Sequence, residues 1–200
     1  MYAGLFIAVA AIVYVRCDNQ LVGSVLFSVG LLSCVCYKLY LCTGRANRPW
    51  RSLICKDPYP CSDSFWTELV LWLALYAINC FFALTFGLIA KHAIDVSKAS
   101  DIVATKISHP WYWILFMGLL CGLLIQAGVH AARKSVGGLA MVVLCVTAFL
   151  MLGGEHCVAD AAFIGMAQLS DWSDVLGCLK LVSLAGAGNL LAGLPFYDEW

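Results

Sequence analysis

The sequence predicts an all-α membrane protein of six transmembrane helices, and three observations lead to that prediction. Hydrophobic residues make up 62% of the 200 residues and charged residues 12%, with a mean hydropathy of +0.88. A soluble domain carries about 25% charged residues, which it needs to cover its surface. Six apolar segments follow one another between polar stretches, and two of them are interrupted near their middles. The chain therefore belongs to the class of polytopic membrane proteins.

The six candidate spans follow from length, because a transmembrane helix needs about 20 apolar residues. They cover residues 2–15, 20–42, 65–90, 111–132, 137–168 and 176–197. The first is short for a span. It lacks a basic leading region and a small-residue cleavage site, and further spans follow it. We therefore interpret it as a transmembrane helix and not as a cleavable signal.

Basic residues in short loops predict the orientation of the spans. The second and fourth loops share one side with both termini and carry six basic residues: Arg45, Arg48, Arg51, Lys56, Arg133 and Lys134. The opposite loops carry five: Arg16, Lys91, Lys98, Lys106 and Lys180. This small difference favours cytoplasmic termini in the cell inner (plasma) membrane. The formal net charge is zero and no basic tract is present, so nucleic acid is not an expected partner.

The two interrupted spans occupy equivalent places, second of three in each half of the chain. One is interrupted at YKLYLCTGR, residues 37–45, and the other at GGEHCVAD, residues 153–160. Helix breaks at matching positions indicate an inverted repeat with a site at the bilayer midplane. We expect one transmembrane channel domain, 1–200, with repeats 1–90 and 111–197. Non-helical backbone at that depth lines a cavity or is buried in protein, which favours a channel or transporter.

The segment GGEHCVAD contains three ionisable residues, Glu155, His156 and Asp160, directly behind an apolar run. Ionisable side chains inside a membrane are costly and commonly mark a transport pathway. Imidazole titrates near neutrality, so His156 is expected to donate a proton or a hydrogen bond to a substrate. If helix continued through His156, Asp160 would share its face at the i, i+4 spacing. Glu155 is expected to satisfy free backbone N–H groups of the broken helix.

The eleven cysteines leave an enzymatic alternative open. Most lie in apolar runs, where a thiol behaves as a small hydrophobic group. Cys55 and Cys61, in the loop CKDPYPC, are close enough to form a disulfide or share a metal, but no second pair completes a zinc set. A membrane thiol oxidoreductase would use this pair or Cys34 and Cys36, although the sequence has no CxxC motif. A haem-binding subunit is less favoured, since only one histidine is clearly intramembrane. We expect no enzyme activity, catalytic residue, metal or cofactor.

Five segments, in order, resemble the formate/nitrite transporter family along nearly the whole chain. They are AGLFIAVAAIVYV, LVGSVLFSVGLLSCVC with LYLCTG, KISHPWYWILFMGLLCGLLIQAGV, GGEHCVADAAFIGM and WSDVLGCLKLVSLAGAGNLLAG. The resemblance implies a homopentamer in the lipid bilayer, with an aquaporin-like pore through each protomer. The implied substrates are small monovalent anions or their neutral acids, such as formate, nitrite or hydrosulfide. If transport is coupled, protons are a further partner.

The resemblance also assigns pore residues. His156 matches the family's central histidine, and Thr43 matches the threonine that faces it from the broken second helix. Lys106 matches the lysine that draws anions into the outer vestibule. Asn189 matches an asparagine of the sixth helix. An isolated carboxylate costs tens of kcal/mol in an apolar medium, so a fixed positive charge or protonation of the anion would ease its passage.

The implied constrictions are formed by Leu41 on the cytoplasmic side and by Phe27 and Phe149 on the outer side. Three positions depart from the family's pattern. Cys42 stands where many members carry a constriction phenylalanine, and Gly122 stands where the fourth helix usually has asparagine. Asp160 replaces the asparagine that follows the histidine, and it places an acid one helical turn beyond His156.

Overall fold

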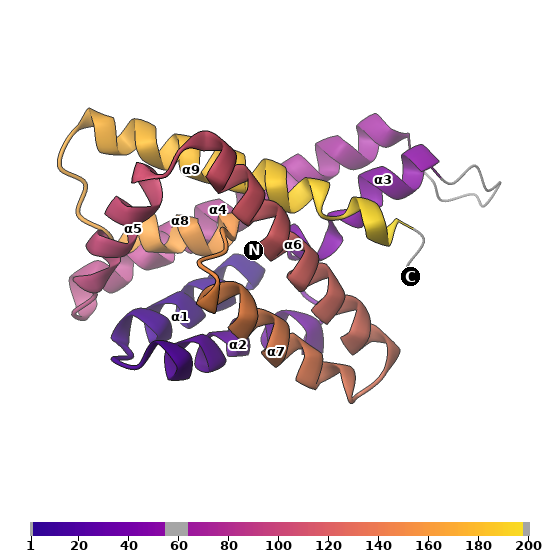
Figure 1. The fold of residues 1–200 in the computed structure, drawn as a ribbon, viewed down its shortest axis with the longest axis horizontal. Helices are drawn as coiled ribbons and strands as arrows, with labels where there is room; N and C mark the ends of the chain where they lie inside the picture. The colour runs from indigo at the N-terminus through magenta and orange to yellow at the C-terminus, as the bar shows by residue number, and fades with distance from the viewer. Residues whose placement is uncertain (1, 55–63, 198–200) are drawn as a thin grey trace.

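The computed structural model describes residues 2–54 and 64–197, and these residues form helices and connecting loops without a strand. The all-helical fold that the sequence predicts is therefore confirmed (Figure 1). The elements in chain order are α1 (Tyr2–Arg16), α2 (Gln20–Cys36), η1 (Thr43–Arg45), α3 (Asn47–Ile54), α4 (Phe65–Ala93), α5 (Lys98–Ser108), α6 (Trp111–Lys134), α7 (Gly138–Met151), α8 (Cys157–Met166), α9 (Trp172–Leu191) and η2 (Leu194–Phe196).

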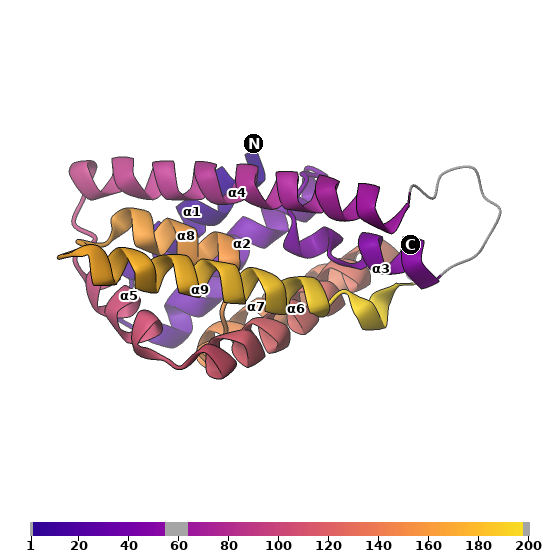
Figure 2. The same cartoon turned by 90° about the horizontal axis from the view of Figure 1, so that it is seen from above.

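Three segments are long and apolar enough to cross a membrane by themselves: α4, α6 and residues 172–196, which contain α9. The other apolar helices, α1, α2, α7 and α8, are shorter, with 10 to 17 residues each. Figure 2 shows α4 and α9 running along the long axis of the molecule with α8 between them. Helix α5 lies at one end of this axis, and α3 lies at the other (Figures 1 and 2).

The helices pack into a closed ring. Helix α1 contacts α2 and α4, α2 contacts α7, and α7 contacts α6. Helix α6 in turn contacts α9, α9 contacts α8, and α8 returns to α4. The buried core lies inside this ring and includes Phe27, Ile114, Phe149 and Leu181.

Small residues allow α8 to approach α4 closely. A Cβ atom added at Gly165 on α8 would overlap the backbone oxygen of Leu84, and one at Gly87 on α4 would overlap the backbone oxygen of Ala162. Helices in membranes commonly use small residues in this way, because backbone-to-backbone packing replaces the hydrophobic drive that lipid cannot supply.

Both interrupted spans consist of two short helices joined by non-helical backbone. Helix α2 ends at Cys36, Lys38 takes a positive φ of 53°, and the next helical turn begins at Thr43. Helix α7 ends at Met151, Gly153 takes a φ of 72°, and α8 begins at Cys157. The helical segments that follow the two breaks, η1 and α8, thus start within the stretches 37–45 and 153–160 where the sequence shows breaks.

Candidate pore site

The two helix breaks meet at a buried contact between Thr43 and His156. Thr43 Oγ1 lies 3.0 Å from His156 Nε2, and the two residues are 0% and 2% exposed. His156 is the N-cap of α8, and its Nδ1 accepts a hydrogen bond from the Ala159 backbone N–H at 3.1 Å. A neutral imidazole whose Nδ1 accepts must carry its proton on Nε2. His156 therefore donates to the Thr43 hydroxyl, and that hydroxyl proton is free for another acceptor.

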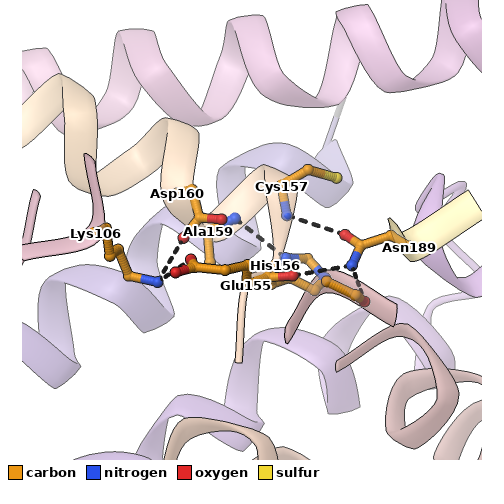
Figure 3. A network of polar contacts seen from close by, with 8 residues as sticks. Lys106, Glu155, His156, Cys157, Ala159, Asp160 and Asn189 are labelled. Atoms are coloured by element: carbon orange, nitrogen blue, oxygen red, sulfur yellow. Dashed lines mark hydrogen bonds and ion pairs between the residues drawn. The ribbon is translucent and has the colours of Figure 1, made fainter. Parts of the chain in front are cut away.

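Two asparagines hold the two breaks in the same way. The amide oxygen of Asn79 on α4 accepts from Cys42 N at 2.9 Å, and its nitrogen donates to the Tyr40 carbonyl at 3.2 Å. The amide oxygen of Asn189 on α9 accepts from Cys157 N at 3.0 Å, and its nitrogen donates to the Glu155 carbonyl at 2.9 Å (Figure 3).

In each case one side chain binds an N–H group and the carbonyl two residues before it. Both asparagines are fully buried. Each one satisfies polar backbone groups that the break leaves without helical partners.

Two further side chains fix the first break. Gln126 on α6 donates from Nε2 to the Thr43 carbonyl at 2.6 Å, and Trp72 on α4 donates from Nε1 to the Cys42 carbonyl at 2.9 Å. Sequence reasoning missed Asn79, Trp72 and Gln126. The available signal was an uncharged polar side chain inside an apolar run, which must find a buried partner in the folded protein.

Aromatic rings cover one side of His156. The Phe149 ring stacks near the imidazole with centroids 6.0 Å apart, and Phe27 meets Phe149 edge-on at 6.0 Å. Both phenylalanines are 1% exposed. Helices α2 and α7 thus bring together the two aromatic residues that the resemblance assigns to a constriction.

A basic cavity of about 450 Å³ lies beside the first break, against the last turns of α6. Its lining residues are Leu31, Cys34, Val35, Lys38, Leu39, Leu41, Gly44, Arg45, Val129, Ala132 and Arg133. The three cations, Lys38, Arg45 and Arg133, give this cavity a positive potential, which raises the local concentration of anions. Leu41 lines the cavity, and Thr43 follows it two residues later in the chain.

Lys106 lies beside the second break, where it pairs with two carboxylates (Figure 3). Its Nζ contacts Glu155 Oε2 and lies 3.0 Å from Asp160 Oδ1. The Lys106 side chain is 15% exposed, whereas Glu155 and Asp160 are 0% and 1% exposed. Helix α5, which carries Lys106, begins with an ion pair in which Lys98 Nζ lies 2.7 Å from Asp18 Oδ1. The hydrogen bond and the charge of Lys98 lower the pKa of Asp18 in this exposed loop.

The structure differs from two expectations at the second break. Helix begins after His156, so Asp160 does not share a helical face with it; its carboxylate contacts Lys106, and the imidazole turns to Ala159 and Thr43. Glu155 was expected to satisfy backbone N–H groups, but its carboxylate binds Lys106. The His156 ring and Asn189 satisfy the N–H groups instead.

Gly122 and Cys42, the other two departures from the family pattern, are both buried. Gly122 on α6 faces α9, where an added Cβ would lie 2.5 Å from Ala192 Cβ and 2.9 Å from Asn189 Cα. A larger side chain at this position would push the two helices apart. Cys42 is fully buried beside the pore contact, and its backbone is bound on both sides by Asn79 and Trp72.

Comparison with known proteins decides the family. The sequence matches the formate/nitrite transporter family over residues 1–197. The chain belongs to this family. Like the family as a whole, the chain is a membrane protein. A search of curated proteins gave no match.

Two solved structures have the same fold as this chain. One is described as an FNT family ion channel, with 21% sequence identity and a TM-score of 0.80; the alignment covers 98% of this chain and 82% of that one. The other is described as a pentameric formate channel with formate bound, with 20% identity and a TM-score of 0.76; here the coverage is 98% and 90%.

No contact in the described part of the chain favours the oxidoreductase alternative. Cys34 is buried, Cys36 is exposed, and both are free thiols. Cys34 Sγ lies 3.9 Å from the Ala3 carbonyl. Cys55 and Cys61 lie outside the described residues, so whether they pair is not addressed by the structure.

Proposed function

We propose that this protein passes small monovalent anions, or their neutral acids, through a pore whose centre is the Thr43–His156 contact. Formate, nitrite and hydrosulfide are the substrates that we would test first. The observation that carries this proposal is the buried contact itself, because it joins two helix breaks from opposite halves of the chain at 3.0 Å.

The tautomer of His156 favours hydrogen-bond donation as its role. The Nδ1 atom accepts from Ala159, so the neutral ring presents an N–H at Nε2. Full protonation would place a second N–H on Nδ1, opposite the Ala159 N–H, and would cost that N-cap bond. An anion or acid that reaches Thr43 can accept from Nε2–H in place of the hydroxyl and can accept from the hydroxyl proton as well.

The proposed route runs from the basic cavity past Leu41 to the central contact, and then past Phe27 and Phe149. In the cavity, three cations offset the desolvation of an anion. At the apolar constrictions no such compensation exists, and a charged carboxylate would cost far more there than a neutral acid. Protonation of the substrate during its passage therefore lowers the barrier.

The arrangement of the helices supports six spans built as two inverted three-helix repeats with an aquaporin-like protomer. The pair α1 and α2 corresponds to α6 and α7, and the pair α3 and α4 corresponds to α8 and α9; each pair is in contact. The asparagine bonds at the two breaks follow the same correspondence. We further propose a homopentamer, as described for the formate channel of the same fold, in the plasma membrane with cytoplasmic termini.

The test is flux into proteoliposomes of formate, nitrite, hydrosulfide and acetate over a range of pH, with wild type beside His156→Phe. The phenylalanine keeps a ring of similar size but donates no hydrogen bond. Loss of a bond to a charged group costs about 1.5–3 kcal/mol, so we expect flux to fall at least about tenfold.

The matched control is His92→Phe, at an exposed histidine near the end of α4. This change should leave flux at the wild-type level. If none of the small acids enters the vesicles through wild type, the transport proposal is wrong. If flux through His156→Phe equals that through wild type, the central role of His156 is wrong.

A further inference from the structure

Two buried carboxylates share a single buried ammonium beside the second break. Lys106 Nζ contacts Glu155 Oε2 and lies 3.0 Å from Asp160 Oδ1. Glu155 comes from the break, Asp160 from the first turn of α8, and Lys106 from α5, so three segments converge on one point (Figure 3). Neither carboxyl group has more than 1% of its side chain exposed. We refer to these three residues as the Lys106 cluster.

The charges of the Lys106 cluster do not balance if both acids are ionised. One ammonium and two carboxylates leave a net charge of −1 in a site that solvent barely reaches. Burial of an uncompensated charge costs several kcal/mol even after relaxation of the protein. Among the described residues, Glu155 Oε1 and Asp160 Oδ2 accept no hydrogen bond, and Asp160 Oδ1 has only the approach of Lys106. Unpartnered buried carboxylate oxygens require a donor that the visible contacts do not supply.

The elements that surround the Lys106 cluster offer no second charge to complete it. Helix α8 packs against α1, α4, α5 and α9, and α6 lies beside the break through Cys121 and Met117. The titratable groups that face the break and α8 are His156, which is a neutral ring, Tyr14 on α1, Tyr76 and Cys80 on α4, Cys121 on α6, Cys157 on α8, His109 next to α5, and Lys180 on α9. Lys91 on α4 lies at the far end of α8, where its Nζ donates to the Ala167 carbonyl at 2.8 Å. Thiols and phenols are neutral near neutral pH. Lys180 is held elsewhere, because its Nζ donates to the carbonyls of Ile107 and His109.

We propose that the Lys106 cluster is a buried proton-binding site, in which Glu155 and Asp160 together hold one proton at neutral pH. One acid is then a neutral carboxylic acid, the other is a carboxylate, and Lys106 balances it. The added O–H group also supplies the donor that the unpartnered oxygens lack. Two carboxyl groups in one site commonly behave in this way, because both cannot ionise at close range.

A bound proton changes what an arriving anion meets on the α5 side of the pore. A cluster with a net charge of −1 would repel it, whereas a neutral cluster with an ammonium would not. The site is also separate from His156, whose imidazole keeps its N-cap bond as a neutral ring. Lys106 and Glu155 alone would balance, so it is Asp160 that adds the uncompensated charge. The inference does not depend on which anion is carried or on transport itself.

Infrared spectroscopy of the purified protein tests the proton directly, through the carbonyl stretching band of a protonated carboxylic acid. At about pH 7.5 exposed carboxyl groups are ionised and contribute nothing to this band. We expect wild type to show the band, with the frequency shift on transfer to D2O that an exchangeable acid proton gives. Asp160→Asn and Glu155→Gln should each abolish it, because Lys106 then balances the one remaining carboxylate.

The amide of asparagine has the size and shape of the Asp160 carboxyl group, so Asp160→Asn is expected to fold. The matched control is Glu68→Gln, at a carboxylate that is also buried but pairs with the guanidinium of Arg48 at 3.0 Å. This change should leave the band intact. Absence of the band from wild type would overturn the proposal, and so would a band that persists unchanged in both cluster variants. Flux plays no part in this readout, so a failure of the transport proposal would leave its result unaffected.

Discussion

The replacement Asn79→Ala offers a quantitative test of how the first helix break is held. Asn79 was invisible to sequence reasoning, yet its side chain binds two backbone groups of the break. Alanine would leave Cys42 N–H and the Tyr40 carbonyl without these partners. Cys42 is fully buried, so no water replaces the bond that its N–H would lose.

The expected cost follows from the two bonds. A buried donor left without a partner costs about 1–3 kcal/mol, and a second bond contributes about 0.5–1.5 kcal/mol. We therefore expect Asn79→Ala to lower the free energy of unfolding by about 1.5–4.5 kcal/mol. Asn189 makes the two equivalent bonds and a third, in which its amide nitrogen donates to the Gly118 carbonyl at 2.8 Å, so Asn189→Ala should cost at least as much.

The assay is unfolding of the purified protein by increasing SDS in mixed micelles, followed by circular dichroism. Thr85→Ala on the same helix is the control, because its hydroxyl bonds only to the Phe81 carbonyl one turn back. That change should cost less than about 0.5 kcal/mol, as expected away from special features. Equal losses in the Asn79 and Thr85 variants would refute the reasoning, since the break would not depend on the asparagine.

Three further predictions concern packing, charge and pore width. Gly165→Ala should destabilise the protein by about 1–3 kcal/mol, because the added Cβ would overlap the Leu84 backbone. Gly137→Ala is the control and should leave stability unchanged, because the nearest atom to its added Cβ is 3.8 Å away. Unfolding in SDS measures both variants. Lys38→Asn removes one cation from the cavity, and asparagine tolerates the positive φ of this position. Anion flux through this variant should fall at low ionic strength and approach the wild-type flux at high salt, because salt screens the lost charge. Leu41→Ala should increase the flux of acetate relative to formate, because it removes side-chain volume between the cavity and Thr43, and a competition assay in vesicles would measure the ratio.

The fold was predictable in its outline because a membrane imposes strong rules on sequence. Apolar runs of span length, and polar residues that interrupt two of them, indicated helices and breaks at 37–45 and 153–160. The structure has non-helical backbone within both stretches. What the residues alone did not predict was the contact across the breaks. Thr43 and His156 are 113 residues apart, and only the resemblance to a family placed them face to face.

The surroundings of the site were less predictable, for reasons visible at particular residues. Asn79 is one polar residue in a long apolar helix, and its partners are backbone atoms 37 and 39 residues away. Asp160 was expected beside His156 from helical spacing, but that spacing holds only if both residues are helical. His156 takes φ −108° and ψ 106° as the N-cap, so its ring and the Asp160 carboxylate diverge. The partner of Asp160 is Lys106, which the resemblance had matched to the lysine that draws anions into the outer vestibule.

The central claim is that Thr43 and His156 act on the substrate as one unit, and a double-mutant cycle on formate flux tests it most directly. Thr43→Val removes the hydroxyl with little change of shape, and His156→Phe removes the N–H donor. Because the two side chains bind each other at 3.0 Å, we expect the double variant to lose much less than the product of the single losses, with a coupling of about 1 kcal/mol or about fivefold in flux. Losses that multiply independently would contradict the account, because they would show that the two residues do not share a site on the path of the substrate.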